Sequence, residues 1–209
     1  MAKVYFYYSA MNAGKSTTLL QASYNYMERG MQTLIFGPKL DQRFGSKTLI
    51  YSRIGLKQEA IPYDNDFDFF AYVKKQKDNM ENLRCILVDE VNFLKKAHIA
   101  QLMRVAMELD VAVLCYGLRS DFLGEPFEGS MYLLAWAHEL IEIKTICNCG
   151  RKATMNIRLK DGKPVKAGEK FQVGGNESYI SQCMKCYMQK IPTIKDCAEK
   201  KECVMAKGE

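Results

Sequence analysis

The start of the chain combines a short apolar run, a glycine-containing loop and a helix-compatible stretch. Residues 4–8 predict a buried strand, and residues 17–29 have a helical pattern. The octapeptide between them fits the Walker A phosphate-binding pattern at every position except the first, where serine replaces glycine: Ser9-Ala10-Met11-Asn12-Ala13-Gly14-Lys15-Ser16. Such a loop directs backbone N–H groups toward one point at the positive end of a helix, so this segment predicts a polyphosphate site.

Three residues of this loop have separate tasks. Gly14 lets the backbone approach the phosphates, and Lys15 supplies a positive charge that reaches the outer phosphates. The hydroxyl of Ser16 can ligate a phosphate-bound magnesium ion. The alternative is a turn that only caps a helix, and the strand before it together with the helix after it favours nucleotide binding.

Strand-like and helical segments alternate through the first two thirds of the chain. The predicted strands are residues 4–8, 33–36, 85–88, 112–116 and 140–146. The predicted helices are residues 17–29, 67–77, 97–109 and 130–136. This order indicates an α/β fold with a mostly parallel sheet flanked by helices, an architecture to which a P-loop on the first strand belongs. Ligands of such sheets bind beyond the carboxyl ends of the strands, so Ser9, Asp89 and Gly117 are expected to converge on one cleft.

A second apolar run ends in two acids. Residues 85–88 predict a buried strand, and Asp89 and Glu90 follow it directly, as in a Walker B element. Asp89 can hold magnesium, and Glu90 lies where a carboxylate can accept a proton from an attacking oxygen. The alternative is a strand that simply ends in solvated acids, and the phosphate-binding loop on another strand of the same sheet favours the catalytic interpretation.

Further sequence features narrow the class of nucleotide-binding protein. The chain has no Asn-Lys-x-Asp element, with which a GTPase reads guanine. With 209 residues it is shorter than a helicase or motor ATPase normally requires. A small-molecule kinase remains.

The length of the chain and the distribution of its apolar residues limit which domains and membrane segments it can contain. The apolar segments 86–88, 111–115 and 133–137 are too short to span a bilayer, and the N-terminus lacks the regions of a signal peptide. We therefore expect a cytoplasmic protein. We expect a nucleotide-binding domain over residues 1–146, a metal-stapled lobe over residues 147–190 and a flexible tail over residues 191–209.

Four of the eight cysteines form two close pairs in the second lobe. Four soft thiolates with this separation favour a closed tetrahedral zinc site with a structural role. The ligands are Cys147, Cys149, Cys183 and Cys186. Between the pairs lie a hairpin turn at residues 161–163 and a glycine-rich segment at residues 174–176, which predict a tethered loop able to act as a lid. Cys85 and Cys115 are expected in the core, whereas Cys197 and Cys203 are expected as unpaired bystanders.

The net charge of +6 is concentrated in residues 147–190, which hold nine basic residues and three acids. Solvated lysines on a small module explain this surplus, and so does a surface for an anionic ligand or nucleic acid. The second interpretation describes an ATP-regulated nucleic-acid-binding protein and rests only on this charge and the zinc lobe.

Several motifs together resemble the bacterial branch of the type II thymidine kinases, which combine a P-loop kinase domain with a zinc-binding lasso domain. The resemblance covers the chain to about residue 190. The motifs that carry it are residues 7–16, Ser52-Arg53-Ile54-Gly55-Leu56, Val88-Asp89-Glu90, residues 115–122, Leu133-Leu134-Ala135-Trp136 and Gly174-Gly175-Asn176-Glu177-Ser178-Tyr179.

The resemblance implies transfer of the γ-phosphoryl group of ATP to the 5'-hydroxyl of thymidine or deoxyuridine. It implies Glu90 as general base, Ser16 and Asp89 as magnesium ligands, and Arg53 as the group that steadies charge on the transferring phosphate. The implied ATP-binding residues are Ser9, Ala10, Met11, Asn12, Ala13, Gly14, Lys15, Ser16, Asp89, Glu90, Val91 and Asn92. The implied nucleoside-binding residues are Met11, Phe93, Phe122, Phe127, Phe171, Gln172, Val173, Gly174 and Tyr179.

The chain departs from the family pattern at two positions. Asn92 stands where the family often has glutamine, one methylene longer, and Cys186 stands where some bacterial relatives have a histidine zinc ligand. The resemblance further implies Mg²⁺ with ATP and structural Zn²⁺ as cofactors, a homotetramer, and inhibition by the end product dTTP. It implies no membrane partner and no nucleic-acid partner.

Overall fold

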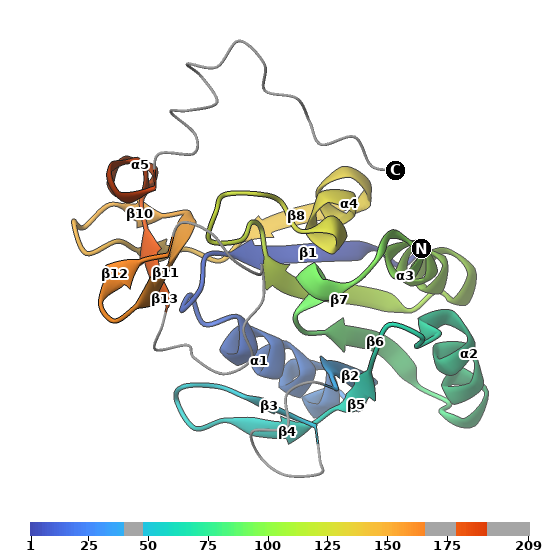
Figure 1. The fold of residues 1–209 in the computed structure, drawn as a ribbon. Coiled ribbons are helices and arrows are strands. Elements are labelled where there is room, and N and C mark those ends of the chain that lie inside the picture. Colours follow the sequence, from blue (N-terminus) through green and yellow to red (C-terminus); the bar gives the residue numbers. More distant parts are fainter. Residues whose placement is uncertain (40–47, 166–178, 192–209) are drawn as a thin grey trace. The chain divides into compact units, whose positions relative to one another are not determined.

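This computed structural model describes residues 1–39, 48–165 and 179–191. The N-terminal elements are β1 (Val4–Ser9), α1 (Lys15–Glu28), β2 (Gln32–Pro38), β3 (Leu49–Tyr51), β4 (Lys57–Glu59), β5 (Ile61–Tyr63) and α2 (Phe69–Asn79). The central elements are β6 (Leu83–Val88), the 3₁₀ helix η1 (Val91–Phe93), α3 (Lys96–Leu109), β7 (Ala112–Leu118), α4 (Glu128–Trp136) and β8 (Glu139–Glu142). The C-terminal elements are β9 (Thr145–Ile146), β10 (Lys152–Ala153), β11 (Met155–Lys160), β12 (Lys163–Pro164), β13 (Tyr179–Gln182) and α5 (Met184–Lys190) (Figure 1).

A six-stranded sheet, ordered β5-β2-β6-β7-β1-β8, forms the centre of the first part of the chain. Every neighbouring pair of its strands is parallel. Helices cover both faces of this sheet, so nearly all side chains of the central strands β6 and β7 are buried and most of them are apolar. The predicted α/β class and the strands expected at residues 4–8, 33–36, 85–88 and 112–116 are confirmed.

Alternating side chains of β6 enter two separate cores. Ile86 and Val88 pack with residues of α2, α3 and α4 on one face of the sheet. Cys85 and Leu87 pack with Leu19 and other residues of α1 on the opposite face. The four predicted helices are confirmed, with ends shifted by at most two residues.

The strand predicted over residues 140–146 is wrong as a single element. β8 ends at Glu142 and pairs with β1, whereas β9 begins at Thr145 and pairs antiparallel with β10 in a different sheet. The backbone N–H of Ile143 still bonds the carbonyl of Tyr8, and the chain leaves the main sheet after it. An apolar run alone does not show where a strand changes its partner.

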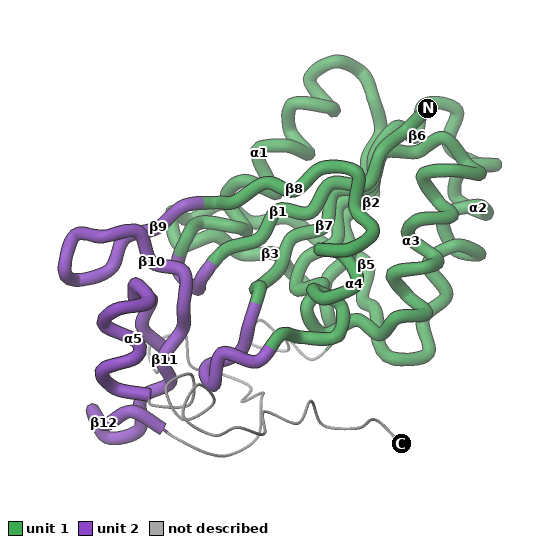
Figure 2. The backbone as a smooth tube through the Cα atoms, turned by 90° about the horizontal axis from the view of Figure 1, so that it is seen from above, with its two compact units in different colours: residues 1–9, 13–119, 126–143 green, residues 10–12, 120–125, 144–209 purple. Residues whose placement is uncertain are grey.

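The chain divides into two compact units (Figure 2). The first comprises residues 1–9, 13–119 and 126–143, and the second comprises residues 10–12, 120–125 and 144–209. The described part of the second unit contains the β9–β10 pair, the sheet β12-β11-β13 and α5. A small core of Met155, Ile157, Tyr187 and Ile191 joins β11 to α5.

The turn predicted at residues 161–163 is confirmed in the second unit. Asp161 and Gly162 both have positive φ angles, of 51° and 73°, between the antiparallel strands β11 and β12. Two successive left-handed residues are the geometry of a type I′ hairpin turn, which Asp-Gly sequences favour.

Candidate active site and metal centre

The loop after β1 delivers a glycine, a lysine and a serine to the start of α1. Gly14 is the N-cap of α1 and has a φ of 85°, a conformation that favours glycine. Lys15 is buried, and the described residues offer its ammonium group no hydrogen bond or ion pair. No acidic residue lies in the first turn of α1. The helix N-terminus and Lys15 therefore place uncompensated positive charge beside the loop.

The tip of this loop, Ala10–Asn12, belongs to the second unit and is bonded there. The Met11 N–H donates to Asn156 Oδ1 over 2.8 Å, and the Met11 carbonyl accepts a hydrogen bond from the Ser181 hydroxyl. Asn12 Nδ2 donates to the Tyr179 carbonyl over 3.5 Å. Both backbone groups of Met11 are therefore used in holding the tip against β11 and β13.

Asp89 and Glu90 follow β6 directly. Asp89 is buried, and its Oδ1 accepts a hydrogen bond from the Glu90 N–H over 3.0 Å. Glu90 is half-buried and adopts a left-handed conformation, with φ 51° and ψ 39°. The main chain thus turns sharply between the two acids, and β6, two strands away from β1, ends at the same sheet edge.

The helical turn η1 carries the next residues of the predicted site. Val91 and Asn92 are buried, and Asn92 Oδ1 accepts a hydrogen bond from the Leu118 N–H over 3.0 Å. The short asparagine side chain therefore links η1 to the end of β7. Phe93 is half-buried and meets Phe127 edge-on, with ring centroids 5.9 Å apart.

The remaining predicted residues lie in several places. Arg53 is exposed in the β3–β4 turn. The Ser52 N–H donates to the Leu56 carbonyl across this turn, and the Leu56 N–H donates to the Ser52 hydroxyl oxygen. Ser9 is buried at the end of β1. In the second unit Phe122 is buried beneath the Arg158 guanidinium, 4.1 Å from the ring centroid, and Tyr179 is half-buried. The predicted contacts Phe171, Gln172, Val173 and Gly174 lie outside the described residues, as do Cys197 and Cys203.

Four cysteines come together in the second unit. The sulfur atoms of Cys147, Cys149, Cys183 and Cys186 all lie within 4.8 Å of one another. Four sulfurs around one zinc ion are separated by about 3.8 Å, since each Zn–S bond is about 2.3 Å long. The cluster could therefore hold a metal ion such as zinc, as the spacing of the cysteines predicts.

The backbone around these cysteines favours thiolates. N–H groups lower the pKa of three thiols, with Cys149 acting on Cys147, Arg151 on Cys149, and Cys186 on Cys183. Hydrogen bonds from the fourth thiol to Cys183 and Cys149 raise the pKa of Cys186 to about 12. Because a metal cation stabilises thiolates, this donor set fits zinc.

Sequence reasoning missed several residues of these sites. Tyr63 donates from β5 to the carbonyls of both Walker B acids, and Asn156 holds the tip of the phosphate loop. Arg158 covers the Phe122 ring. Neither residue type nor spacing marks these positions, because each acts through a partner distant in sequence.

The parallel sheet and the phosphate-loop sequence define a P-loop nucleotide-binding fold, here joined to a second unit with a four-cysteine cluster. A family model described as "TK: Thymidine kinase" matches residues 2–187. The chain therefore belongs to the thymidine kinase family. No helix in the described ranges has the length and apolar content needed to cross a membrane.

Curated relatives agree with this family. The chain is 55% identical over 194 residues to a thymidine kinase of Coxiella burnetii, covering 92% of this chain and 98% of the relative. It is 53% identical over 192 residues to a thymidine kinase of Yersinia pseudotuberculosis, covering 91% and 97%. It is 54% identical over 192 residues to that of Pasteurella multocida, covering 91% and 99%.

Proposed function

We propose that this chain is an ATP-dependent thymidine kinase that forms dTMP and ADP from thymidine and ATP. Membership of the thymidine kinase family carries the proposal. The geometry of the first unit supports it, because the buried Lys15 and the Asp89-Glu90 pair lie at the carboxyl ends of parallel strands, where ligands of such sheets bind.

In the proposed reaction Glu90 is the general base. Its carboxylate accepts the proton of the thymidine 5'-hydroxyl as that oxygen forms a bond to the γ-phosphorus of ATP. The bond between the γ-phosphorus and the β,γ-bridging oxygen breaks, and ADP leaves. Glu90 is half-buried, so it is partly open to solvent.

The phosphate loop and Arg53 would stabilise the negative charge of the phosphate groups during this step. The residues of the loop 9–16 would bind the triphosphate, with Lys15 opposite the outer phosphates. Its buried ammonium has no protein partner among the described residues, which suits an anionic ligand. Arg53 is exposed on the β3–β4 turn, and its guanidinium would supply charged hydrogen-bond donors to the transferring phosphoryl group.

The oxygen donors Ser16 and Asp89 suit Mg²⁺, which prefers hard oxygen ligands. Asp89 is buried and has one carboxylate oxygen committed to the Glu90 N–H. When bound with ATP, Mg²⁺ would neutralise part of the negative charge of the phosphates. Zn²⁺ at the four cysteines would have a structural role, because four protein ligands leave no open position.

The proposed nucleoside contacts are Met11 and four aromatic residues together with the segment 171–174. Phe93 and Phe127 pack together in the first unit, whereas Met11, Phe122 and Tyr179 belong to the second. We further infer a cytoplasmic homotetramer that dTTP inhibits by occupying the active site. Resemblance to the type II enzymes supports these last inferences.

The direct test incubates the purified chain with Mg-ATP and separate samples of thymidine, deoxyuridine, deoxycytidine and deoxyguanosine. Formation of dTMP with matching release of ADP is expected, and its absence refutes the proposal. Glu90→Gln is expected to lower kcat by about 100-fold or more while ATP binding is retained. Glu81→Gln, an exposed change on another loop, serves as the control.

A further inference from the structure

The segment that connects β6 to α3 carries Glu90 in an unfavourable backbone conformation. A left-handed φ is disfavoured for a residue with a side chain, since its Cβ crowds the following carbonyl. Glu90 nevertheless has a φ of 51° and a ψ of 39°. Contacts from neighbouring elements must therefore hold this turn, and through it the direction of the Glu90 side chain.

Tyr63 supplies one such contact. Its hydroxyl lies 2.7 Å from the Asp89 carbonyl and 3.1 Å from the Glu90 carbonyl. Carbonyl oxygens only accept, so the single phenolic proton is shared between these two groups. The Tyr63 ring is buried and packs on Phe69 with centroids 5.4 Å apart, which fixes the position of the hydroxyl.

The hydroxyl of Tyr63 stays protonated in this position. Burial raises the pKa of Tyr63 well above its usual value, and the charges of Glu90 and Asp89 raise it further. The phenol is therefore a donor throughout the pH range in which a kinase works.

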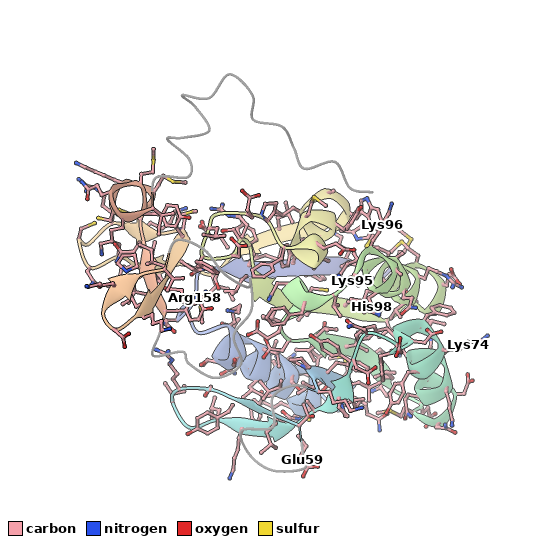
Figure 3. The ribbon with its side chains drawn as sticks, in the orientation of Figure 1. Glu59, Lys74, Lys95, Lys96, His98 and Arg158 are labelled. Atoms are coloured by element: carbon pink, nitrogen blue, oxygen red, sulfur yellow. The ribbon has the colours of Figure 1, made fainter. Side chains whose placement is uncertain are left out.

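The loop after β5 also holds the far end of the same segment. His98 Nε2 lies 3.0 Å from the Asn65 carbonyl, so this nitrogen donates, and His98 Nδ1 accepts a hydrogen bond from the Lys95 N–H over 3.2 Å. His98 is buried at the start of α3, close to Lys95 and Lys96 (Figure 3). Tyr63 thus holds the start of the segment 89–95, and Asn65, two positions further on, holds its end through His98.

We propose that Tyr63 is a positioning residue for phosphoryl transfer, which holds the Asp89-Glu90 turn so that the Glu90 carboxylate meets the acceptor hydroxyl. The Asn65–His98 contact supports the same segment from its other end. The proposal rests on the proposed function, in which Glu90 is the base. Tyr63 acts on the main chain of the acids and needs no contact with substrate.

The test compares Tyr63→Phe with Tyr72→Phe in the full chain. Tyr63→Phe keeps the packed ring and removes only the hydroxyl whose proton is shared. The Tyr72 hydroxyl has no hydrogen bond among the described residues, and its ring packs on Phe36 and Phe67. We expect kcat of Tyr63→Phe to fall about tenfold, with the KM values for ATP and thymidine changed less than about twofold. Tyr72→Phe is expected to match the parent chain.

A double-mutant cycle separates positioning from general loosening. In the Glu90→Gln background Tyr63→Phe is expected to have no further effect on kcat, because the carboxylate that it positions is gone. An equal loss in both backgrounds overturns the proposal, and so does an unchanged kcat in Tyr63→Phe. If Glu90→Gln is itself fully active, the base assignment fails and the positioning proposal fails with it.

A second route keeps the proposal testable if Tyr63→Phe does not fold. Tyr63→Met keeps an apolar side chain of similar length without the hydroxyl, and His98→Gln loosens the other end of the segment 89–95. For both variants kcat is expected to fall in the parent chain and to stay unchanged in the Glu90→Gln background. An undiminished kcat in the folded Tyr63→Met chain overturns the proposal for Tyr63, and an undiminished kcat in folded His98→Gln overturns the proposed support from Asn65 and His98.

Discussion

The Asn156 side chain joins the tip of the phosphate loop to the neighbouring loop that follows β7. Its Oδ1 accepts a hydrogen bond from the Met11 N–H over 2.8 Å, and its Nδ2 donates to the Ser120 carbonyl over 3.2 Å. Asn156 is buried on β11, and each end of its amide meets a group that it can bond. Asn156 thus bonds both residues 10–12 and residues 120–125, the two segments that group with the C-terminal unit.

Replacing Asn156 by alanine should weaken both stability and ATP binding. The change leaves the Met11 N–H and the Ser120 carbonyl without their partner, and a buried unsatisfied group costs about 1–3 kcal/mol. We expect the free energy of unfolding to fall by that amount in urea titrations, with a raised KM for ATP because the loop tip is released. The exposed change Asn79→Ala is the control, and an unaltered KM for ATP in Asn156→Ala would contradict a role in shaping the loop.

The cysteine cluster predicts a bound metal that stabilises the second unit. We expect about one zinc ion per chain by elemental analysis, since one set of four ligands is present among the described residues. Cys183→Ser should lose this zinc and lower the unfolding temperature, because the described core of the unit is small. Cys197→Ser, a change at a cysteine expected from the sequence to be a bystander, should keep the zinc, and full stability of metal-free Cys183→Ser would refute a structural role.

Local sequence patterns were enough to predict the four middle strands of the central sheet, β2, β6, β7 and β1, and the two motifs on them. The strand, loop and helix around Gly14 are continuous in sequence, and Asp89 follows its strand directly, so both could be recognised without tertiary information. The cysteine pairs were also recognisable, because metal ligands must be of a few residue types with short spacings.

The features that the sequence did not predict depend on contacts between residues far apart in the chain. Tyr63 bonds groups 26 and 27 positions away, and Asn156 bonds one 145 positions away, so no local pattern marks either. The single strand expected over residues 140–146 divides because its two halves find different partners. Short elements such as β5 and α5 were missed since they span too few residues to show a period.

The carboxylate of Glu128 should stabilise the start of α3 in a pH-dependent way. Its Oε1 accepts a hydrogen bond from the Lys96 N–H over 2.9 Å, and this bond, with help from Lys95, lowers the pKa of Glu128 below 4.5. A lowered folded-state pKa means that the stabilisation is present above about pH 4.5 and is lost as the pH falls below it. Glu128→Gln should therefore cost roughly 0.3–1 kcal/mol near neutral pH, toward the lower end because the side chain is partly exposed.

Urea titrations of Glu128→Gln and the parent chain at about pH 7 and about pH 4 measure this effect. The difference in the free energy of unfolding between the two proteins should be smaller at the lower pH. Glu81→Gln, at an exposed position with no ion pair among the described residues, should show no such trend. If the difference in the free energy of unfolding did not change with pH, the charge of Glu128 would contribute nothing to the stability of the start of α3.

Gly129 should tolerate no side chain, because α4 packs directly on the main chain of η1. A Cβ at this position would lie 2.1 Å from the Val91 carbonyl oxygen and 2.9 Å from that of Leu94. Helix propensity alone predicts that Gly129→Ala gains about 0.5–1 kcal/mol, whereas the clash predicts a loss of about 3 kcal/mol, since backbone atoms cannot move aside easily. Ala135→Gly on the exposed face of α4 calibrates the propensity term and should cost about 0.5–1 kcal/mol. Denaturant unfolding of both variants decides between the two terms, and a stabilised Gly129→Ala would show that α4 can separate from η1 without cost.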